Sequence, residues 1–309
     1  MLHDHRGIIS RGIFVLFLAG VLAVAGCRSD PPGGTTGPLR VGYMICNSLQ
    51  ETMDRFEPLT AYLSDVLGRE VVSRYINTFE FEEAVEQGEL DMVHTNSLLY
   101  VILNEDYDWK LLSGEKRGEH GSHTAGAIIV RRDSPLNKVA DLKGKRLMFG
   151  PELAPMGYLS QYYLLLEAGL NPEMDLAYYA IPRGSFKHEK VVYAVLYGDY
   201  DAGAIPILDL ETMEDEGKIR KDDFRILAVG ELIPYCTFST SPDLPAGTRD
   251  SAREALLGLT KDATARVGDE NLLVLDRAMI DGFELLSDED YEPIRRMARR
   301  ANMPPFQEY

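Results

Sequence analysis

The stretch that decides the fold reads LRVGY at residues 39–43 and, after a polar loop, FEPLTAYLSDVLG at residues 56–68. The first segment is short and largely apolar, which is typical of a buried strand. In the second segment the apolar side chains recur at the spacing of one helix face. Pro58 fits the first turn of such a helix, and Gly68 fits its end. The stretch therefore predicts a strand followed by an amphipathic helix that begins near Phe56.

The same alternation continues toward the C-terminus. Asn77-Thr78-Phe79-Glu80 has the form of a capping box, which predicts a helix from there to about Gly88. Strands that alternate with helices indicate an α/β fold with mostly parallel sheets flanked by helices. Further strands are predicted at 71–76, 91–94, 125–130, 145–149, 177–181 and 201–205, and further helices at 157–168 and 188–197.

The N-terminus predicts export from the cytoplasm. Arg6 and Arg11 precede an apolar run at 13–23, which is shorter than the about 20 residues of a membrane-spanning helix. Residues 1–26 are therefore predicted to be a signal peptide.

Small residues directly before Cys27 resemble the lipobox of bacterial lipoproteins, which implies a lipid on the Cys27 thiol. An ordinary signal peptide, or a membrane anchor that is not cut, is the alternative. Residues 27–38 are rich in Pro and Gly, so they are predicted to form the lipidated cysteine and a flexible spacer. The expected location is the cell envelope, on the periplasmic or extracellular face, with the protein anchored to a membrane.

The chain is strongly acidic, with a formal net charge of −17. This charge argues against nucleic acid or anionic lipid headgroups as partners. An anionic small molecule would need a local basic pocket.

Signatures of catalysis and of metal binding are missing. There is no Gly-x-Ser-x-Gly elbow, Walker loop, Gly-x-Gly-x-x-Gly loop after a strand or Cys-x-x-Cys. His120 and His123 are interpreted as part of a solvated loop. Cys46 and Cys236 are predicted either to form one disulfide or to be buried separately. We expect no enzyme activity, no metal and no cofactor.

Six segments carry a resemblance to a known family. They read RVGY at 40–43, FEPLTAYLS at 56–64, GELDM at 88–92, ADLKGKRLMFG at 140–150, GYL at 157–159 with LEAG at 166–169, and the segment 188–205. Taken in this order they resemble the phosphate/phosphite/phosphonate type of ABC-transporter substrate-binding protein, a branch of the two-lobed type II periplasmic binding proteins.

The resemblance implies two α/β lobes joined by crossovers near 124–127 and 233–237. The first lobe would comprise residues 39–124 and 237–309, and the second lobe residues 125–236. A small ligand would bind in the cleft between them, and closure would follow because only the closed form offers both sets of contacts.

Loops at the carboxyl ends of parallel strands, and the helix N-termini after them, form the ligand crevice of such sheets. In the first lobe this rule, together with the resemblance, selects Tyr43, Thr78, Phe79, Thr95, Asn96 and Ser97.

In the second lobe the resemblance implies a binding loop that in the family commonly reads Ser-Thr-Ser-Gly. Here the loop reads Ala154-Pro155-Met156-Gly157, so its hydroxyl donors are missing and Pro155 lacks a backbone donor. Orthophosphate is therefore disfavoured, and a larger organic ligand is at least as well supported.

Charged residues could replace the missing hydroxyls. Arg183, Lys187 and His188 lie together at a predicted helix start and could bind an anionic head directly. Met156 and Tyr158 would make the pocket more apolar. His188 matches a ligand-site histidine of the family, and Asp201 lies near an acidic position that can bind an amine.

The function implied is that of an extracytoplasmic solute-binding lipoprotein that captures a small ligand, either a phosphonate-like anion or a larger organic molecule, for an ABC permease. Two alternatives stay open. One is a sensor that presents its closed form to a membrane receptor. The other is an enzyme on the same fold, with His188 and Asp201 as its acid–base pair.

Overall fold

A computed structural model describes residues 37–118 and 121–308. The predicted signal peptide, Cys27, most of the spacer and His120 lie outside the described residues. All the described residues belong to one unit of the chain. Within them, no helix has the length and apolar character needed to cross a membrane.

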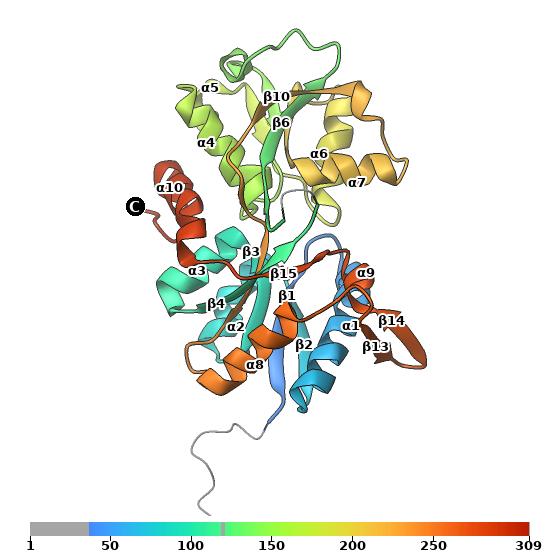
Figure 1. Ribbon diagram of the computed structural model, residues 1–309. Helices are drawn as coiled ribbons and strands as arrows, with labels where there is room; N and C mark the ends of the chain where they lie inside the picture. The colour runs from blue at the N-terminus through green and yellow to red at the C-terminus, as the bar shows by residue number, and fades with distance from the viewer. Residues whose placement is uncertain (1–36, 119–120, 309) are drawn as a thin grey trace, which may run out of the picture. The chain divides into compact units, whose positions relative to one another are not determined.

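The first sheet has six strands in the order β15-β4-β12-β3-β1-β2 (Figure 1). Its strand β1 lies between β2 and β3 and runs parallel to both, whereas β12 runs antiparallel to β3 and β4, and β15 antiparallel to β4. The strands are β1 (Leu39–Met44), β2 (Val71–Ile76), β3 (Met92–Asn96), β4 (Lys110–Lys116), β12 (Cys236–Thr240) and β15 (Gly282–Glu284).

The second sheet has five strands in the order β10-β6-β9-β7-β8. Strand β7 is parallel to β8 and β9, and β6 is antiparallel to β9 and β10. The strands are β6 (Gly126–Arg131), β7 (Arg146–Met148), β8 (Tyr178–Ala180), β9 (Ala202–Pro206) and β10 (Phe224–Val229). The predicted α/β class is confirmed, but both sheets are mixed rather than mostly parallel, because strands that return from the other sheet enter antiparallel.

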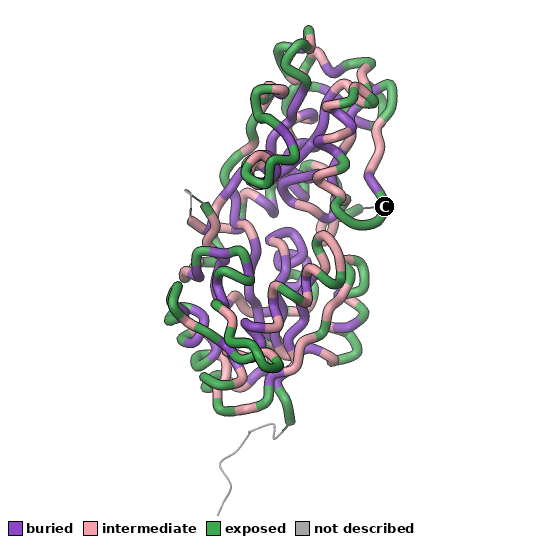
Figure 2. The backbone as a smooth tube through the Cα atoms, turned by 90° about the vertical axis from the view of Figure 1, so that its right-hand side faces the viewer, coloured by how far each residue is buried: buried purple, intermediate pink, exposed green. Residues whose placement is uncertain are grey.

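Helices cover both sheets. Helices α1, α8 and α9 share one apolar core with the first sheet, and residues of α2, α3, α4 and α10 share a second core that also includes β6, β7 and β9. Figure 2 shows the buried parts of the backbone in purple inside both halves. A third core joins α6 and α7 to the second sheet. The helices are α1 (Leu49–Leu67), α2 (Phe81–Glu86), α3 (Ser97–Tyr107), α4 (Ser160–Glu167), α5 (Pro172–Asp175), α6 (Lys187–Leu196), α7 (Ile207–Asp215), α8 (Ala246–Leu257), α9 (Val274–Ala278) and α10 (Glu292–Ala301).

The chain passes from the first sheet to the second after β4 and returns before β12. On the way it forms two short strands, β5 (His123–Thr124) and β11 (Ile233–Pro234), which pair antiparallel with each other. The C-terminal helix α10 contacts α3 beside the first sheet and α4 beside the second. The hairpin of β13 (Thr264–Val267) and β14 (Glu270–Leu273) projects beside α1 and α9 (Figure 1).

Two local predictions were wrong. Helix α1 begins at Leu49 rather than near Phe56, because Ser48 caps it by accepting a hydrogen bond from the Glu51 amide (3.2 Å), so Pro58 lies inside the helix. The predicted capping box at Asn77 does not form. Asn77 Nδ2 donates a hydrogen bond to Glu80 Oε2 (3.1 Å), and the Asn77 side chain accepts none from the backbone. A 3-10 turn precedes α2.

Candidate functional site

A cavity of about 400 Å³ is lined by residues of both sheets and their connecting loops. Met44 is the last residue of β1 and Cys46 follows it, while His94 and Asn96 lie on β3. The opposite wall includes the loop before α4 and the first turns of α6 and α7. Hydrogen bonds between described residues join the walls: for example, the Phe186 amide donates to the Asn47 carbonyl (3.3 Å), and Asn96 Nδ2 donates to the Leu153 carbonyl (3.1 Å).

Alternation along β3 decides which of its side chains reach the cavity. His94 and Asn96 line it, whereas Thr95 between them points to the opposite face of the sheet and is fully buried. Ser97, also fully buried, is the first residue of α3. Thr95 and Ser97 were predicted as ligand-binding residues, but neither is among the residues that line the cavity.

Three other predicted residues are also displaced from the cavity wall. Tyr43 is fully buried, accepts a hydrogen bond from the Thr60 hydroxyl (3.0 Å) and stacks on Phe56. Tyr158 packs on Phe149 with ring centroids 4.7 Å apart, and Arg183 lies in an exposed loop. Tyr43 and Tyr158 are buried in aromatic packing, and Arg183 is exposed in a loop, so none of the three side chains lines the cavity.

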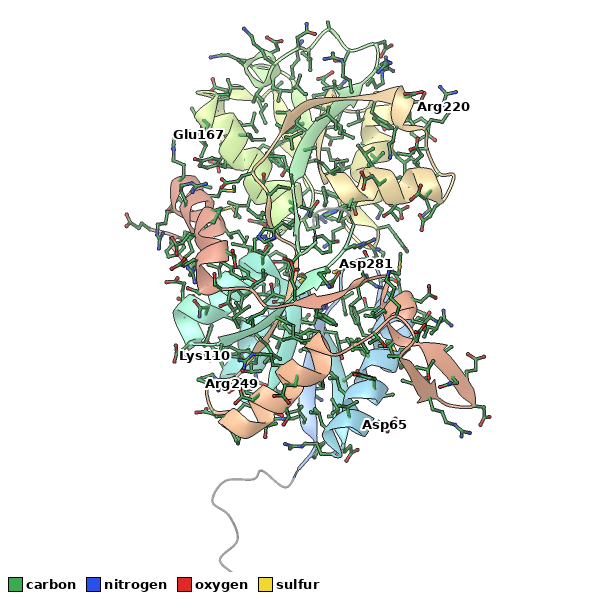
Figure 3. The ribbon with its side chains drawn as sticks, in the orientation of Figure 1. Asp65, Lys110, Glu167, Arg220, Arg249 and Asp281 are labelled. Atoms are coloured by element: carbon green, nitrogen blue, oxygen red, sulfur yellow. The ribbon has the colours of Figure 1, made fainter. Side chains whose placement is uncertain are left out.

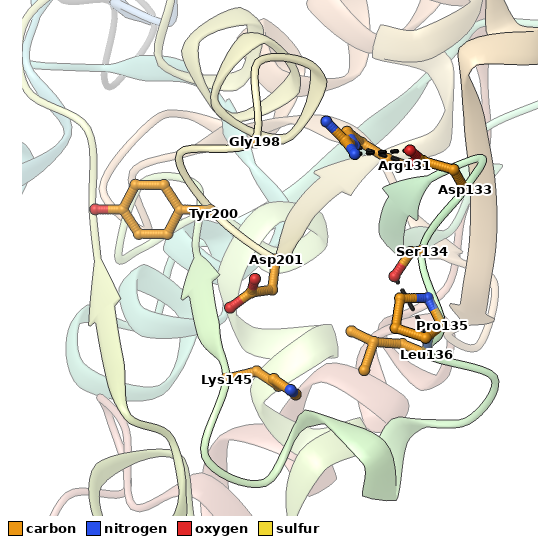
Figure 4. A pocket seen from close by; sticks show the side chains of 9 residues that line it. All are labelled: Arg131, Asp133, Ser134, Pro135, Leu136, Lys145, Gly198, Tyr200 and Asp201. Atoms are coloured by element: carbon orange, nitrogen blue, oxygen red, sulfur yellow. Dashed lines mark hydrogen bonds and ion pairs between the residues drawn. The ribbon is translucent and has the colours of Figure 1, made fainter.

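Asp201 lies in a different, shallow pocket, together with Arg131 and Tyr200 (Figure 4). There it forms an ion pair with Arg146 (3.2 Å). Burial alone would raise the pKa of Asp201, but hydrogen bonds from Arg146 outweigh it and lower the pKa. Asp201 therefore cannot pair with His188, and the acid–base pair of the enzyme alternative does not exist.

The structure gives His188 a different partner. His188 Nδ1 forms a hydrogen bond with Asp209 Oδ2, which joins the first turn of α6 to that of α7. Both side chains line the cavity. Gly150 and Gly157 leave room for the imidazole, because a Cβ on Gly157 would lie 2.9 Å from His188 Nε2. Gly157 is thus next to the site without being part of its lining.

The cavity contains further predicted residues. Thr78, Phe79, Asn96, Met156, Lys187 and His188 all line it. They come from four separate stretches of the chain, which the fold brings together.

Arg117 is the main residue that the sequence reasoning missed. It follows β4, lines the cavity and forms no ion pair with a carboxylate in the described part of the chain. Its guanidinium donates long hydrogen bonds, each 3.4 Å, to the hydroxyls of Tyr235 and Thr212. A second cavity arginine, Arg55, donates to the Ala278 carbonyl (2.9 Å). Elsewhere charged side chains such as Lys110 and Arg220 project away from the ribbon (Figure 3).

Sulfur atoms line much of the cavity. The two cysteines outside the N-terminal segment, Cys46 and Cys236, are separate thiols, and both line it. Cys46 is accessible through the cavity but surrounded by protein, and this burial raises its pKa to about 11. Four methionines join them in the lining: Met44, Met156, Met213 and Met279. The wall is therefore soft and polarizable.

A cavity between two α/β halves, each built on a mixed sheet, is the arrangement of the type II periplasmic-binding-protein fold. Residues 41–291 match the family model described as "ABC transporter, phosphonate, periplasmic substrate-binding protein", and the chain belongs to this family. The family is one of extracytoplasmic binding proteins rather than of enzymes.

Several solved structures have this fold, and two of them are binding proteins connected with phosphonates. PhnD1 from Prochlorococcus marinus, solved in complex with methylphosphonate, is 20% identical, with a TM-score of 0.72 over 86% of this chain and 99% of that one. A binding protein component of an ABC phosphonate transporter from Pseudomonas aeruginosa is 15% identical, with a TM-score of 0.71 over 86% of this chain and 87% of that one.

A curated relative has a different description. The chain is 29% identical over 245 residues to the tetrathionate sensor histidine kinase TtrS of Salmonella typhimurium. The match covers 78% of this chain and 39% of that protein, so the chain spans well under half the length of this relative.

Proposed function

We propose that the protein captures a small organic anion in the cavity between its sheets and presents it to an ABC permease. The observation that carries this proposal is Arg117, a cavity cation without a carboxylate partner among the described residues. Lys187 adds a second such cation to the wall. Guanidinium groups bind phosphonate and sulfonate oxygens through paired hydrogen bonds.

The volume and lining of the cavity also indicate which kind of group is attached to the anionic group of the ligand. Its volume of about 400 Å³ lies within the range of small-molecule pockets. The thiols and thioethers favour a polarizable or apolar body, and Phe79 and Phe186 add aromatic surface. We propose a phosphonate, sulfonate or related sulfur oxyanion larger than orthophosphate.

The two lobes would close on the ligand by a hinge motion. The first lobe comprises residues 39–124 and 237–309, and the second lobe comprises residues 125–236. The hydrogen bonds from Phe186 and from Asn96 across the cavity support a closed form in which both walls contact the ligand. A signal peptide at residues 1–26 and a lipid on Cys27 would keep the protein near its membrane partner.

A second candidate function is sensing. The relative named as a tetrathionate sensor supports it, because tetrathionate is an anion rich in sulfur and the cavity is lined by six sulfur-bearing side chains. In that case the closed form would signal to a membrane receptor instead of docking a permease.

Thermal unfolding in the presence of methylphosphonate, an alkanesulfonate, tetrathionate and inorganic phosphate tests these proposals. A ligand at 100 times its dissociation constant adds about 2.7 kcal/mol of stability. We expect a shift with at least one organic or sulfur anion and a smaller one with phosphate. A shift with tetrathionate alone would favour the sensor, and a shift with methylphosphonate would favour the transporter component.

Arg117→Gln is the decisive variant. Loss of one charge-assisted contact is expected to weaken binding about 10–100-fold. Arg131→Gln is the matched control, because Arg131 pairs with Asp133 outside the cavity. Equal losses in both variants, or no shift with any of the anions, would contradict the proposed site.

A further inference from the structure

Three strands of the first sheet bring a histidine, a carboxylate and a thiol together beneath the cavity. His94 lies on β3, Glu115 on β4 and Cys236 on β12, the strand between them. One donor atom from each lies within 4.8 Å of the other two, and all three residues are buried. His94 and Cys236 also line the cavity, while Glu115 lies behind them.

One carboxylate oxygen of Glu115 has no hydrogen-bond partner among the described residues. Its side chain is fully buried, and its Oε2 lies 2.8 Å from His94 Nε2. Its other oxygen, Oε1, has no hydrogen-bond partner among the described residues. A buried carboxylate oxygen without a partner is costly, so an additional group in contact with it would be stabilising.

We propose that His94, Glu115 and Cys236 form a binding site for one borderline divalent metal ion, of which Zn²⁺ is the representative. Imidazole nitrogen, carboxylate oxygen and thiolate sulfur are the donors that such ions accept. Ligand atoms bound tetrahedrally to one ion at about 2.0–2.3 Å lie about 3.3–3.8 Å apart, so the donor atoms that are now farthest apart must approach each other by up to about 1.5 Å. The fourth position faces the cavity, because His94 and Cys236 are part of its wall.

The charges of the site balance when the ion binds. Glu115 contributes one negative charge, and Cys236 contributes a second when the ion displaces the thiol proton to solvent. Burial, together with the charge of Glu115, raises the pKa of Cys236. Metal binding therefore releases one proton from Cys236.

Nearby guanidinium groups modulate this site. Arg117 interacts electrostatically with Glu115 and Cys236, and Arg55 with Cys236. Both cations repel a divalent ion, so removal of the Arg117 charge strengthens metal binding while it weakens binding of an anion. The metal site rests on the three side chains and is independent of the ligand proposed above.

Cobalt is a suitable probe, because a cobalt–thiolate bond gives a charge-transfer absorption that oxygen and nitrogen ligands do not give. The experiment uses the whole chain with Cys27→Ser, in which Cys46 and Cys236 are the remaining thiols. We expect one equivalent of Co²⁺ to produce this absorption, excess Zn²⁺ to remove it, and calorimetry with Zn²⁺ to show release of about one proton.

Two cysteine variants form the matched pair. Cys236→Ser is expected to abolish the thiolate absorption and to weaken Zn²⁺ binding by at least about tenfold, whereas Cys46→Ser is expected to keep both. Glu115→Gln should weaken binding but keep the absorption. If Cys236→Ser fails to fold, the absorption in Cys46→Ser still identifies Cys236 as the ligand. The proposal is overturned if the parent chain gives no thiolate absorption, or if Cys46→Ser loses it.

Discussion

Gly157 lies directly against the imidazole of His188: a Cβ built on the glycine would be 2.9 Å from His188 Nε2. Asp209 holds the same ring from its other nitrogen. The position of the His188 ring is therefore set on one side by its contact with Asp209 and on the other by Gly157, which has no side chain.

Gly157→Ala is expected to displace the His188 ring without unfolding the protein. The added methyl group cannot fit at 2.9 Å, and the ring is free to move only by weakening its contact with Asp209. NMR of the imidazole signals, with His188→Gln for assignment, measures the displacement. Gly247→Ala on α8 is the control, because its Cβ would meet nothing within 4 Å. An unchanged His188 signal in Gly157→Ala would contradict this geometry.

Arg295 on α10 is expected to stabilise the C-terminal part of the chain. Its side chain is 3% exposed and pairs with Glu105 (2.6 Å) and Asp288 (2.8 Å). Arg295→Ala should cost about 2–3 kcal/mol, somewhat less than a fully buried pair, because the partner carboxylates reach solvent. Urea unfolding measures the loss. Its neighbour Arg296 forms an exposed pair with Glu231, so Arg296→Ala should cost under about 1 kcal/mol, and equal losses would contradict the assignment.

Asp201 is expected to contribute to acid sensitivity. Its folded-state pKa is depressed by hydrogen bonds from Arg146, despite its partial burial. The stability it provides is therefore fully present above its unfolded pKa of about 3.9, and is lost as the pH falls through the lower folded value. Urea unfolding between pH 7 and pH 3 should show a shallower acid decline in Asp201→Asn than in the parent chain. Identical declines would mean that the pair with Arg146 is too weak to matter.

The two cavity thiols are expected to react at different rates. Cys46 is accessible and has a pKa of about 11, whereas Cys236 is buried. A thiol reagent at pH 8 should therefore modify Cys46 slowly and Cys236 more slowly still, and the Cys46 rate should rise with pH because the thiolate is the nucleophile. Mass spectrometry of timed samples measures both rates. A mass lower by two hydrogens, with neither cysteine reactive, would instead indicate a disulfide.

The α/β class and most element positions could be predicted from the sequence because they depend on local apolar spacing. The mixed sheets could not, because the antiparallel entry of β12 beside β3 depends on where the chain returns from the second sheet. Helix α1 was predicted too short because Ser48 is a weaker signal than Pro58.

The candidate site was only partly predictable, for a related reason. Residues of parallel strand ends and helix starts, such as Asn96 and His188, follow positional rules. Arg117 follows an antiparallel strand that those rules ignore. Asp209, in the first turn of α7, is the partner of His188, whereas Asp201, directly before β9, pairs with Arg146.

Helix α10 touches α3 on one half and α4 on the other, and Arg300 Nε lies 3.6 Å from Glu167 Oε1 on α4. Because α10 contacts both halves at one edge of the cavity, we expect the halves to separate mainly along the opposite edge. If the lobes open as proposed, we expect the ligand to enter and leave along the edge of the cavity that lies away from α10.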